Sequence, residues 1–303
     1  MFSPALLPVK VLTIGRLAPT PSGYLHLGNA VNFVLTWLLV RQAGGTLHLR
    51  IDDLDRARLR RAYLDNIFNV IDWLKISYDI GPSGPDDFLR HYSQLLHLPA
   101  YNHALRRLAL LDMSQQPGLL YGSPRSRTAG AGGLVVPLAT PGVAWRARVP
   151  AGTTISWADG GQGVVHVPLA AEIPDFIVRK KDGVAAYQLA SVVDDLRLGT
   201  TLIVRGHDLL PSTAAQLWLA NQVSDLQNFN QNKIQLFHHH LLTDEAGQKL
   251  SKSTQANNET GILNHPAGPV VVYQAVARLL GLPTDAGESL ATLQAALAAQ
   301  STH

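Results

Sequence analysis

The chain has 303 residues, 46% of them hydrophobic, which is enough for one large domain or two closely connected ones. Its 25 basic and 22 acidic residues give a net charge of +3, which permits contact with a nucleic acid but does not argue for it unaided. Because there is no cysteine, disulfides and zinc sites that need thiolates are excluded.

The N-terminal part of the chain predicts a strand, a loop, a helix and a second strand. Val9–Ile14 is rich in β-branched residues and precedes a Pro/Gly cluster over Ala18–Gly23, as expected for a buried strand that enters a loop. Asn29–Gln42 is expected to be helical, and Thr46–Ile51 alternates like a strand. This order is a βαβ unit, so we expect an α/β fold built on a doubly wound parallel sheet.

The rest of the chain predicts a sheet domain that is split by an insertion. Residues 62–74 and 88–111 are expected to be helical, and residues 111–163 are rich in Gly, Pro, Ser and Thr, with a short strand at 144–149. The elements expected after this insertion are strands at 173–179, 201–205 and 234–238 and helices at 184–196, 212–227, 270–280 and 290–299.

No segment of the sequence predicts export or membrane insertion. Residues 1–12 lack the basic start and long apolar stretch of a signal peptide. The most apolar helical run, Val31–Val40, is too short to cross a bilayer. We therefore expect a soluble, cytoplasmic monomer with no membrane partner.

The loop after the first strand is the first candidate for chemistry. Ligands of open parallel sheets bind at the carboxyl ends of strands, and a helix that starts near His26 offers backbone N–H groups and a positive dipole end there. Gly28 would let a bound group approach the backbone, and His26 can donate a hydrogen bond to a phosphate oxygen. The alternative is a proline-rich loop with a capped helix and an incidental histidine.

A second candidate is Lys249-Leu250-Ser251-Lys252-Ser253, which follows Gly247. Two lysines three residues apart on such a loop can close around a polyphosphate as mobile charges. Taken alone, the segment could equally be a solvated basic turn.

Together the two segments resemble a known family. His26-Leu27-Gly28-Asn29 is similar to the "HIGH" signature of class I aminoacyl-tRNA synthetases, and Lys249–Ser253 is similar to their "KMSKS" signature. The stretches that resemble the glutamyl/glutaminyl subgroup are Arg16–Gly23, Arg50–Asp55, Ala186–Ala190, Val192–Asp195 and Val204–Asp208. The resemblance covers roughly residues 11 to 255.

This resemblance implies a Rossmann-like catalytic domain split by an inserted subdomain, with a helical C-terminal tail. The implied boundaries are 1–112 and 173–253 for the two halves of the catalytic domain, 113–172 for an acceptor-side insertion, and 254–303 for a helical tail.

The resemblance also implies roles for individual residues. His26, Lys249 and Lys252 would be catalytic, and Gly28, Asn29 and Ser251 would join them in binding ATP. The implied contacts to the amino acid are Arg16, Ala18 and Thr20 from the first loop, Asp52 for the ammonium group, and Tyr187 and Arg205 for the side chain and its carboxylate. A planar guanidinium suits bidentate capture of a carboxylate.

The implied substrates are ATP with Mg²⁺, glutamate and a tRNA. Only about fifty residues follow the lysine loop, too few for a large anticodon-binding domain. In this the chain resembles short members of the subgroup that attach glutamate to queuosine, a modified base of tRNA(Asp). Alternatives are a ligase with another acceptor and a non-catalytic binding protein.

The sequence departs from the family at two further points. Asp52 stands where glutamate-specific bacterial enzymes typically carry Glu and the glutaminyl branch has Asp, so both amino acids stay open. Many relatives hold the insertion with a Cys-x-Cys zinc site, whose place is taken here by Leu120–Arg127 without thiols. His238-His239-His240 is a poor metal site, because consecutive strand residues alternate faces.

Basic residues suggest two candidate surfaces for RNA. Arg56–Arg61 is the densest basic run and is either a solvated helix face or a phosphate contact. The insertion offers Arg125, Arg127, Arg146 and Arg148 as a second surface.

Overall fold

The computed structural model describes residues 12–124, 134–241 and 261–300. Lys249, Ser251 and Lys252 of the predicted lysine loop lie outside these residues, as do Arg125 and Arg127 of the insertion.

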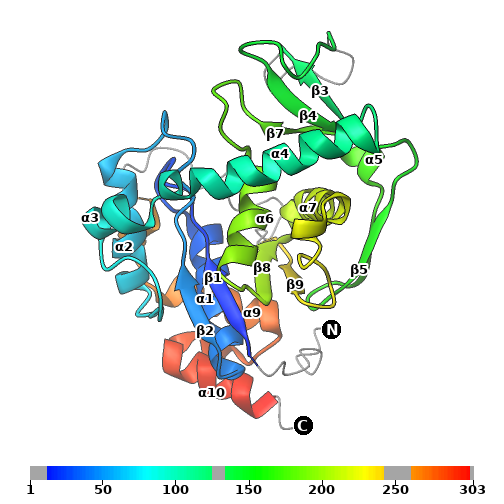
Figure 1. The fold of residues 1–303 in the computed structure, drawn as a ribbon. Coiled ribbons are helices and arrows are strands. Elements are labelled where there is room, and N and C mark those ends of the chain that lie inside the picture. The colour runs from blue at the N-terminus through cyan, green and yellow to red at the C-terminus, as the bar shows by residue number, and fades with distance from the viewer. Residues whose placement is uncertain (1–11, 125–133, 242–260, 301–303) are drawn as a thin grey trace.

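A six-stranded sheet forms the centre of the fold, in the order β2-β1-β8-β9-β5-β6 (Figure 1). Its strands are β1 (Ile14–Leu17), β2 (Thr46–Leu49), β8 (Leu202–Gly206), β9 (Gln235–His239), β5 (Ile155–Asp159) and β6 (Gly163–Val167). All neighbouring pairs are parallel except the β5–β6 hairpin at the edge. The α/β fold with a parallel sheet is therefore as the sequence predicts.

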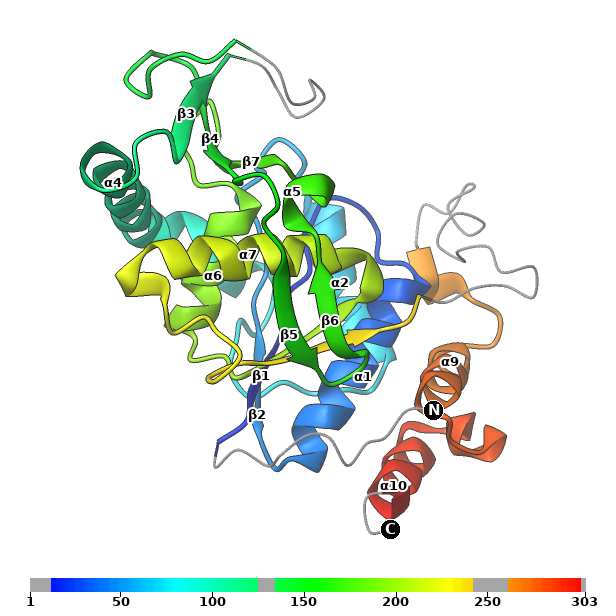
Figure 2. The same ribbon diagram turned by 90° about the vertical axis from the view of Figure 1, so that its right-hand side faces the viewer.

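Helices cover both faces of this sheet. One layer contains α1 (Leu27–Gln42), α2 (Arg61–Trp73), α9 (Val270–Leu280) and α10 (Leu290–Gln300), and the other contains α4 (Leu98–Ser114), α6 (Tyr187–Arg197) and α7 (Leu210–Gln222). Figures 1 and 2 show α6 and α7 on the opposite side of the strands from α1 and α9. None of the helices in the described part of the chain is long and apolar enough to cross a membrane.

The strand side chains divide between two hydrophobic cores. On β8, Leu202 and Val204 belong to the core under α1, whereas Ile203 belongs to the core under α6 and α7. On β9, Phe237 and Leu236 divide in the same way. Successive strand residues point to opposite faces, so the near-continuous apolar runs of these strands reflect burial on both sides. The sheet is doubly wound.

The β1–α1–β2 unit confirms the predicted βαβ order but shifts its first strand. Ile14 pairs with Thr46 and Leu17 with Leu49, so β1 begins where the prediction of 9–14 ended. Helix α1 packs directly on β1 at Gly15, where an added Cβ would lie 2.4 Å from Cγ2 of Val40. Gly15 lies inside the strand, where the absence of a Cβ permits this close approach of the helix.

A separate three-stranded sheet contains β3 (Leu120–Ser123), β4 (Ala144–Arg148) and β7 (Asp175–Arg179), with antiparallel pairing throughout (Figure 2). The strand predicted at 173–179 therefore exists from Asp175, but it pairs with β4 rather than with the parallel sheet. Conversely, β5 and β6 lie within 113–172 and pair with the central sheet. The short apolar pattern of a strand does not specify its partner. The domain boundaries stay predictions.

The single helix predicted over 88–111 is interrupted. The chain forms a short helical turn at Pro85–Asp87, a π-helical turn at Phe88–Tyr92 and a 3₁₀ turn at Gln94–His97 before α4 begins. Between them, the backbone N–H of Gln94 bonds to Oδ1 of Asp53 at 2.8 Å. This long-range contact to the loop after β2 interrupts the helix that the local sequence pattern predicts.

Candidate active site

A cavity of about 530 Å³ lies at the carboxyl ends of β1, β2, β8 and β9. Nine of the residues proposed from the sequence line it: Arg16, Ala18, Thr20, His26, Gly28, Asn29, Asp52, Tyr187 and Arg205. The fold thus brings together residues from distant parts of the sequence. Their individual roles stay predictions, and Lys249, Ser251 and Lys252 lie outside the described residues.

One end of the cavity is the start of α1. His26 is the N-cap residue: its Nδ1 accepts a hydrogen bond from the backbone N–H of Gly28 at 3.1 Å. The side chain of Asn29 accepts from the backbone N–H of His26 at 3.0 Å, which completes a capping box. Such a helix start presents N–H groups and a positive dipole end, which together favour an anion.

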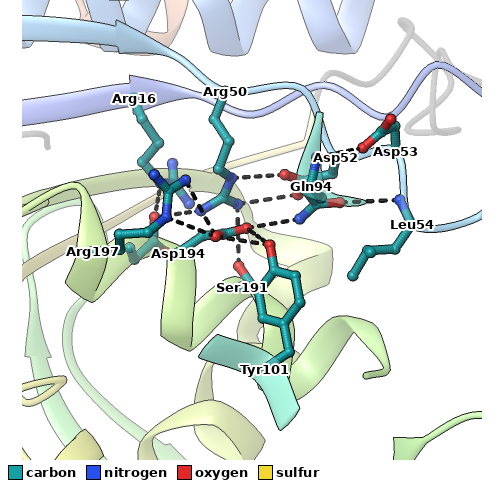
Figure 3. A network of polar contacts seen from close by, with 11 residues as sticks. Arg16, Arg50, Asp52, Asp53, Leu54, Gln94, Tyr101, Ser191, Asp194 and Arg197 are labelled. Atoms are coloured by element: carbon teal, nitrogen blue, oxygen red, sulfur yellow. Dashed lines mark hydrogen bonds and ion pairs between the residues drawn. The ribbon is translucent and has the colours of Figure 1, made fainter. Parts of the chain in front are cut away.

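The other end of the cavity holds buried arginines. Arg50 donates two hydrogen bonds to Asp52, at 2.7 and 3.1 Å, and one to Oδ1 of Asp195 at 2.8 Å. Arg16 donates to the same Oδ1 of Asp195, also at 2.8 Å. Arg50 further donates to the Ser191 hydroxyl at 3.3 Å. Residues from β1, from the segment after β2 and from α6 are therefore joined in one ion network (Figure 3).

The charges of this network are strongly coupled. Burial acts to raise the pKa of Asp195, but Arg16, Arg50 and Arg205 together hold it below its usual value. Burial also raises the pKa of Asp52, and Arg50 offsets this only in part. Against its own burial, the pKa of Arg50 is raised well above its usual value by Asp52 and Asp195. Asp195 is thus a firmly ionised structural anion, and Asp52 is the carboxylate that a further cation would stabilise most.

Arg205 has a different set of partners. It is buried, and its NH1 donates to the Thr213 hydroxyl at 2.8 Å. Its NH2 is buried without a hydrogen-bond partner in the described part of the chain. An unsatisfied buried donor of a charged group is costly, so this nitrogen is a candidate contact for an anionic ligand. Tyr187, in contrast, is 39% exposed at the cavity rim.

A second polar cluster supports the network from behind. Asp194 accepts hydrogen bonds from Tyr101 at 2.8 Å and from Gln94 at 2.8 Å, and Gln94 in turn accepts from the backbone N–H of Leu54 at 3.1 Å. Figure 3 shows this cluster beside Arg50 and Asp52. It ties α4 and α6 to the loop that follows β2, and so fixes where Asp52 stands.

Several residues of the cavity were not proposed from the sequence as site residues. Arg50, Ser191 and His239 all line it. One signal was available for Arg50: it lies two residues before Asp52 at a strand end, so the two share a side of the extended chain. The sequence offers His239 only as a poor metal ligand beside His238, and His238 is fully buried and bonded to Asp159 and Thr213.

A smaller cavity of about 320 Å³ adjoins the first and shares Thr20, Asp52, Tyr187 and Ser191 with it. Arg58 and Lys180 also line this second space. Arg58 belongs to the basic run 56–61, whose other arginines include Arg61, held by Asp65 and Asp86 on the surface. Of the insertion's basic residues, Arg146 pairs with Asp175, and Arg148 lies over the ring of Tyr121.

Comparisons with known proteins identify the family of this chain. The family described as "tRNA synthetases class I (E and Q), catalytic domain" matches residues 10–107 and 141–302. The glutamyl-Q tRNA(Asp) synthetase of Dechloromonas aromatica is 37% identical over 259 residues, which are 80% of this chain and 79% of that protein. The glutamate–tRNA ligase 1 of Roseobacter denitrificans is 30% identical over 278 residues, which are 88% of this chain and 61% of that protein.

A solved structure has the same fold. The glutamate-tRNA synthetase of Elizabethkingia anophelis superposes with a TM-score of 0.73 at 20% sequence identity. The match covers 95% of this chain and 66% of that one.

Proposed function

Since the chain belongs to the class I tRNA synthetase family for glutamate and glutamine (E and Q), and is therefore an aminoacyl-tRNA synthetase-like ligase, we propose that it activates glutamate with ATP and passes the glutamyl group to a tRNA. In the first step, an oxygen of the α-carboxylate attacks the α-phosphorus of ATP, and the bond to the leaving pyrophosphate breaks. In the second, a hydroxyl of the acceptor attacks the acyl carbon, and AMP leaves.

The observation that carries this proposal is the charge at the arginine end of the cavity. Arg16, Arg50 and Arg205 are buried there, and Asp52 and Asp195 are occupied by Arg16 and Arg50. Arg205 has no carboxylate partner among the described residues and keeps a free NH2. A buried guanidinium in this state favours a substrate that brings its own carboxylate.

The remaining roles follow from the chemistry of each group. The α1 start with His26, Gly28 and Asn29 is suited to the phosphates of ATP, and Lys249, Ser251 and Lys252 are proposed to act with it. Asp52 would bind the ammonium group, and Arg16, Ala18, Thr20 and Tyr187 would surround the amino acid. Catalysis of this kind needs positioning and charge stabilisation rather than a side-chain base.

Mg²⁺ is expected to accompany the phosphates of ATP. Within residues 12–124, 134–241 and 261–300, no group of three or more His, Asp or Glu is arranged to hold a metal ion.

For the acceptor we propose queuosine of tRNA(Asp). The support is the similarity to proteins named glutamyl-Q tRNA(Asp) synthetase, which this chain matches over 79%, 87% and 93% of their length. It spans only 60–61% of the glutamate–tRNA ligases it resembles. A cytoplasmic location and a monomeric state stay predictions of the sequence.

The decisive experiment is amino-acid-dependent ATP–pyrophosphate exchange, with and without tRNA. We expect exchange with glutamate in the absence of tRNA, and its loss in Lys252→Ala. Exchange with glutamine alone would contradict the substrate. Labelled glutamate should then appear on tRNA(Asp) that contains queuosine and not on the same tRNA with guanine at that position; labelling of another acceptor would favour a different ligase.

A further inference from the structure

Behind Arg205 lies a buried chain of polar groups, which runs through Thr213 on α7 and His238 on β9 to Asp159 on β5. Oγ1 of Thr213 lies 2.9 Å from Nε2 of His238, and Nδ1 of His238 lies 2.5 Å from Oδ2 of Asp159. Thr213 and His238 are fully buried and Asp159 is 4% exposed. Of these four residues only Arg205 lines the cavity, so this series of polar groups leads from the protein interior to the site.

Asp159, at the far end, is held as an anion. Its Oδ1 accepts from the backbone N–H groups of Gly161, Gln162 and His238, and its Oδ2 accepts from Nε1 of Trp157. Although burial opposes it, these contacts and His238 keep the pKa of Asp159 below its usual value. An acceptor-only carboxylate at 2.5 Å requires that Nδ1 of His238 carry the proton.

The protonation of His238 sets the direction of the remaining bonds. Burial lowers the pKa of His238, and Asp159 opposes this only in part, so the ring is neutral at pH 7. With the proton on Nδ1, Nε2 accepts a hydrogen bond from the hydroxyl of Thr213. The oxygen of Thr213 then presents lone pairs, one of which accepts from NH1 of Arg205 at 2.8 Å.

The β5–β6 hairpin locks this arrangement in place. An added Cβ at Gly161 would lie 2.3 Å from the carbonyl oxygen of His238, so the hairpin turn packs directly on β9. Gln162 donates from Nε2 to the same carbonyl at 2.7 Å. Asp159, at the end of β5, is therefore fixed relative to His238 by backbone contacts on both sides.

We propose that Asp159, His238 and Thr213 are positioning residues that orient Arg205 towards the side-chain carboxylate of the amino acid and so favour glutamate over glutamine. The polar groups supply Arg205 with a neutral hydroxyl as its hydrogen-bond partner and keep the carboxylate of Asp159 two groups away. NH1 is thereby held, and NH2, which has no partner in the described residues, is left for the substrate. A direct carboxylate partner would instead compete with the substrate for the guanidinium. This inference rests on the proposed function.

The matched pair Thr213→Val and Thr213→Ser tests the inference, because valine keeps the shape of threonine and serine keeps its hydroxyl. In glutamate-dependent exchange, Thr213→Val should raise KM for glutamate by roughly 10- to 100-fold, the value of one hydrogen bond to a charged group. KM for ATP should not change, and Thr213→Ser should stay close to wild type. The preference for glutamate over glutamine should fall in the valine variant.

Thr200→Val is the control for loss of a buried hydroxyl. Thr200 precedes the same strand, β8, and its buried Oγ1 has no partner in the described part of the chain. This variant should leave KM for glutamate, KM for ATP and the preference for glutamate over glutamine unchanged. A parallel rise of KM for glutamate and ATP in Thr213→Val, or an unchanged KM for glutamate in that folded variant, would overturn the inference.

A readout that is independent of activity is the ¹⁵N NMR spectrum of the His238 ring. We expect a protonated Nδ1 and an unprotonated Nε2 in the wild type, with the Nε2 resonance moving in Thr213→Val. A His238 ring protonated at Nε2 would contradict the hydrogen-bond directions proposed between Asp159, His238 and Thr213. If wild-type protein shows no glutamate-dependent exchange, the proposed function fails, whereas this tautomer test still decides the polar chain.

Discussion

The two ends of the cavity are built in different ways. At the end formed by the start of α1, His26, Gly28 and Asn29 are neighbours in sequence, and their contacts span two or three residues. At the arginine end, Arg16 and Arg50 meet Asp195 across 179 and 145 residues. The first end depends on a local helix start, the second on the correct assembly of β1, β2 and α6. Substitutions at the two ends should therefore differ in how much they affect folding and how much they affect catalysis.

The largest expected effect is that of Asp195→Asn. This change keeps the shape of the side chain but leaves Arg16 and Arg50 without their shared anion in a buried site. Breaking a buried ion pair in this way costs about 3–5 kcal/mol of unfolding free energy. Urea unfolding measures the loss.

Its control is Asp65→Asn, which removes an exposed partner of Arg61. Exposed ion pairs are screened by water and contribute little to stability, so this variant should unfold close to wild type. Equal losses of unfolding free energy in Asp195→Asn and Asp65→Asn would show that the buried ion network contributes no more to stability than a surface ion pair.

His26→Ala should, in contrast, affect the rate of catalysis more than stability. Loss of an N-cap costs about 0.5–2 kcal/mol of stability, whereas loss of a donor to developing phosphate charge costs roughly 100- to 1,000-fold in rate. The measurement is ATP–pyrophosphate exchange on protein whose folding is verified by thermal melting. His26→Asn keeps a good N-cap without the ring, so it should recover stability but not exchange. Recovery of both would mean that the histidine only caps the helix.

Gly28→Ala is a milder change at the same end. An added Cβ would lie 3.1 Å from Cε1 of His26, so the ring must shift by a few tenths of an ångström. Stability should stay within about 1 kcal/mol, because alanine is the better helix former. ATP–pyrophosphate exchange should fall by roughly tenfold, because the displaced His26 ring would no longer be correctly positioned for the phosphates. An unchanged KM for ATP and kcat would separate Gly28 from nucleotide binding.

The smallest expected effect is a difference in pKa, and so in pH-dependent stability, between two carboxyl groups. The pKa of Asp195 lies below the ordinary value of 3.8, so this group stabilises the fold above pH 3.8 and loses that contribution as the pH falls through its folded pKa. The pKa of Asp52 is raised above 3.8 by burial, so its ionisation weakens the fold as the pH rises from 3.8 through its folded pKa.

Carboxyl ¹³C titration of the folded protein measures both groups. Asp52 should take up its proton at a higher pH than Asp195, and saturating glutamate should lower the pKa of Asp52, because the ammonium group favours the carboxylate. A pKa of Asp52 that does not respond to glutamate would argue against its proposed ammonium contact.

Most local features of this protein are predictable from its amino-acid sequence. Apolar periodicity located most helices and strands, and the helix α9 lies at 270–280, as predicted. The helix start near His26 followed from the local pattern, whereas nine of the residues that line the cavity were named through the resemblance of short motifs to a family.

The combination of distant segments, in contrast, became visible in the folded protein alone. The tertiary structure placed β7 in the small sheet, broke the helix predicted over 88–111, and joined Arg50 to Asp195 and Arg205 to the Thr213–His238–Asp159 chain. Each of these depends on which buried polar groups find partners once the layers pack, and the energy of such pairing is a property of the assembled interior rather than of any local stretch.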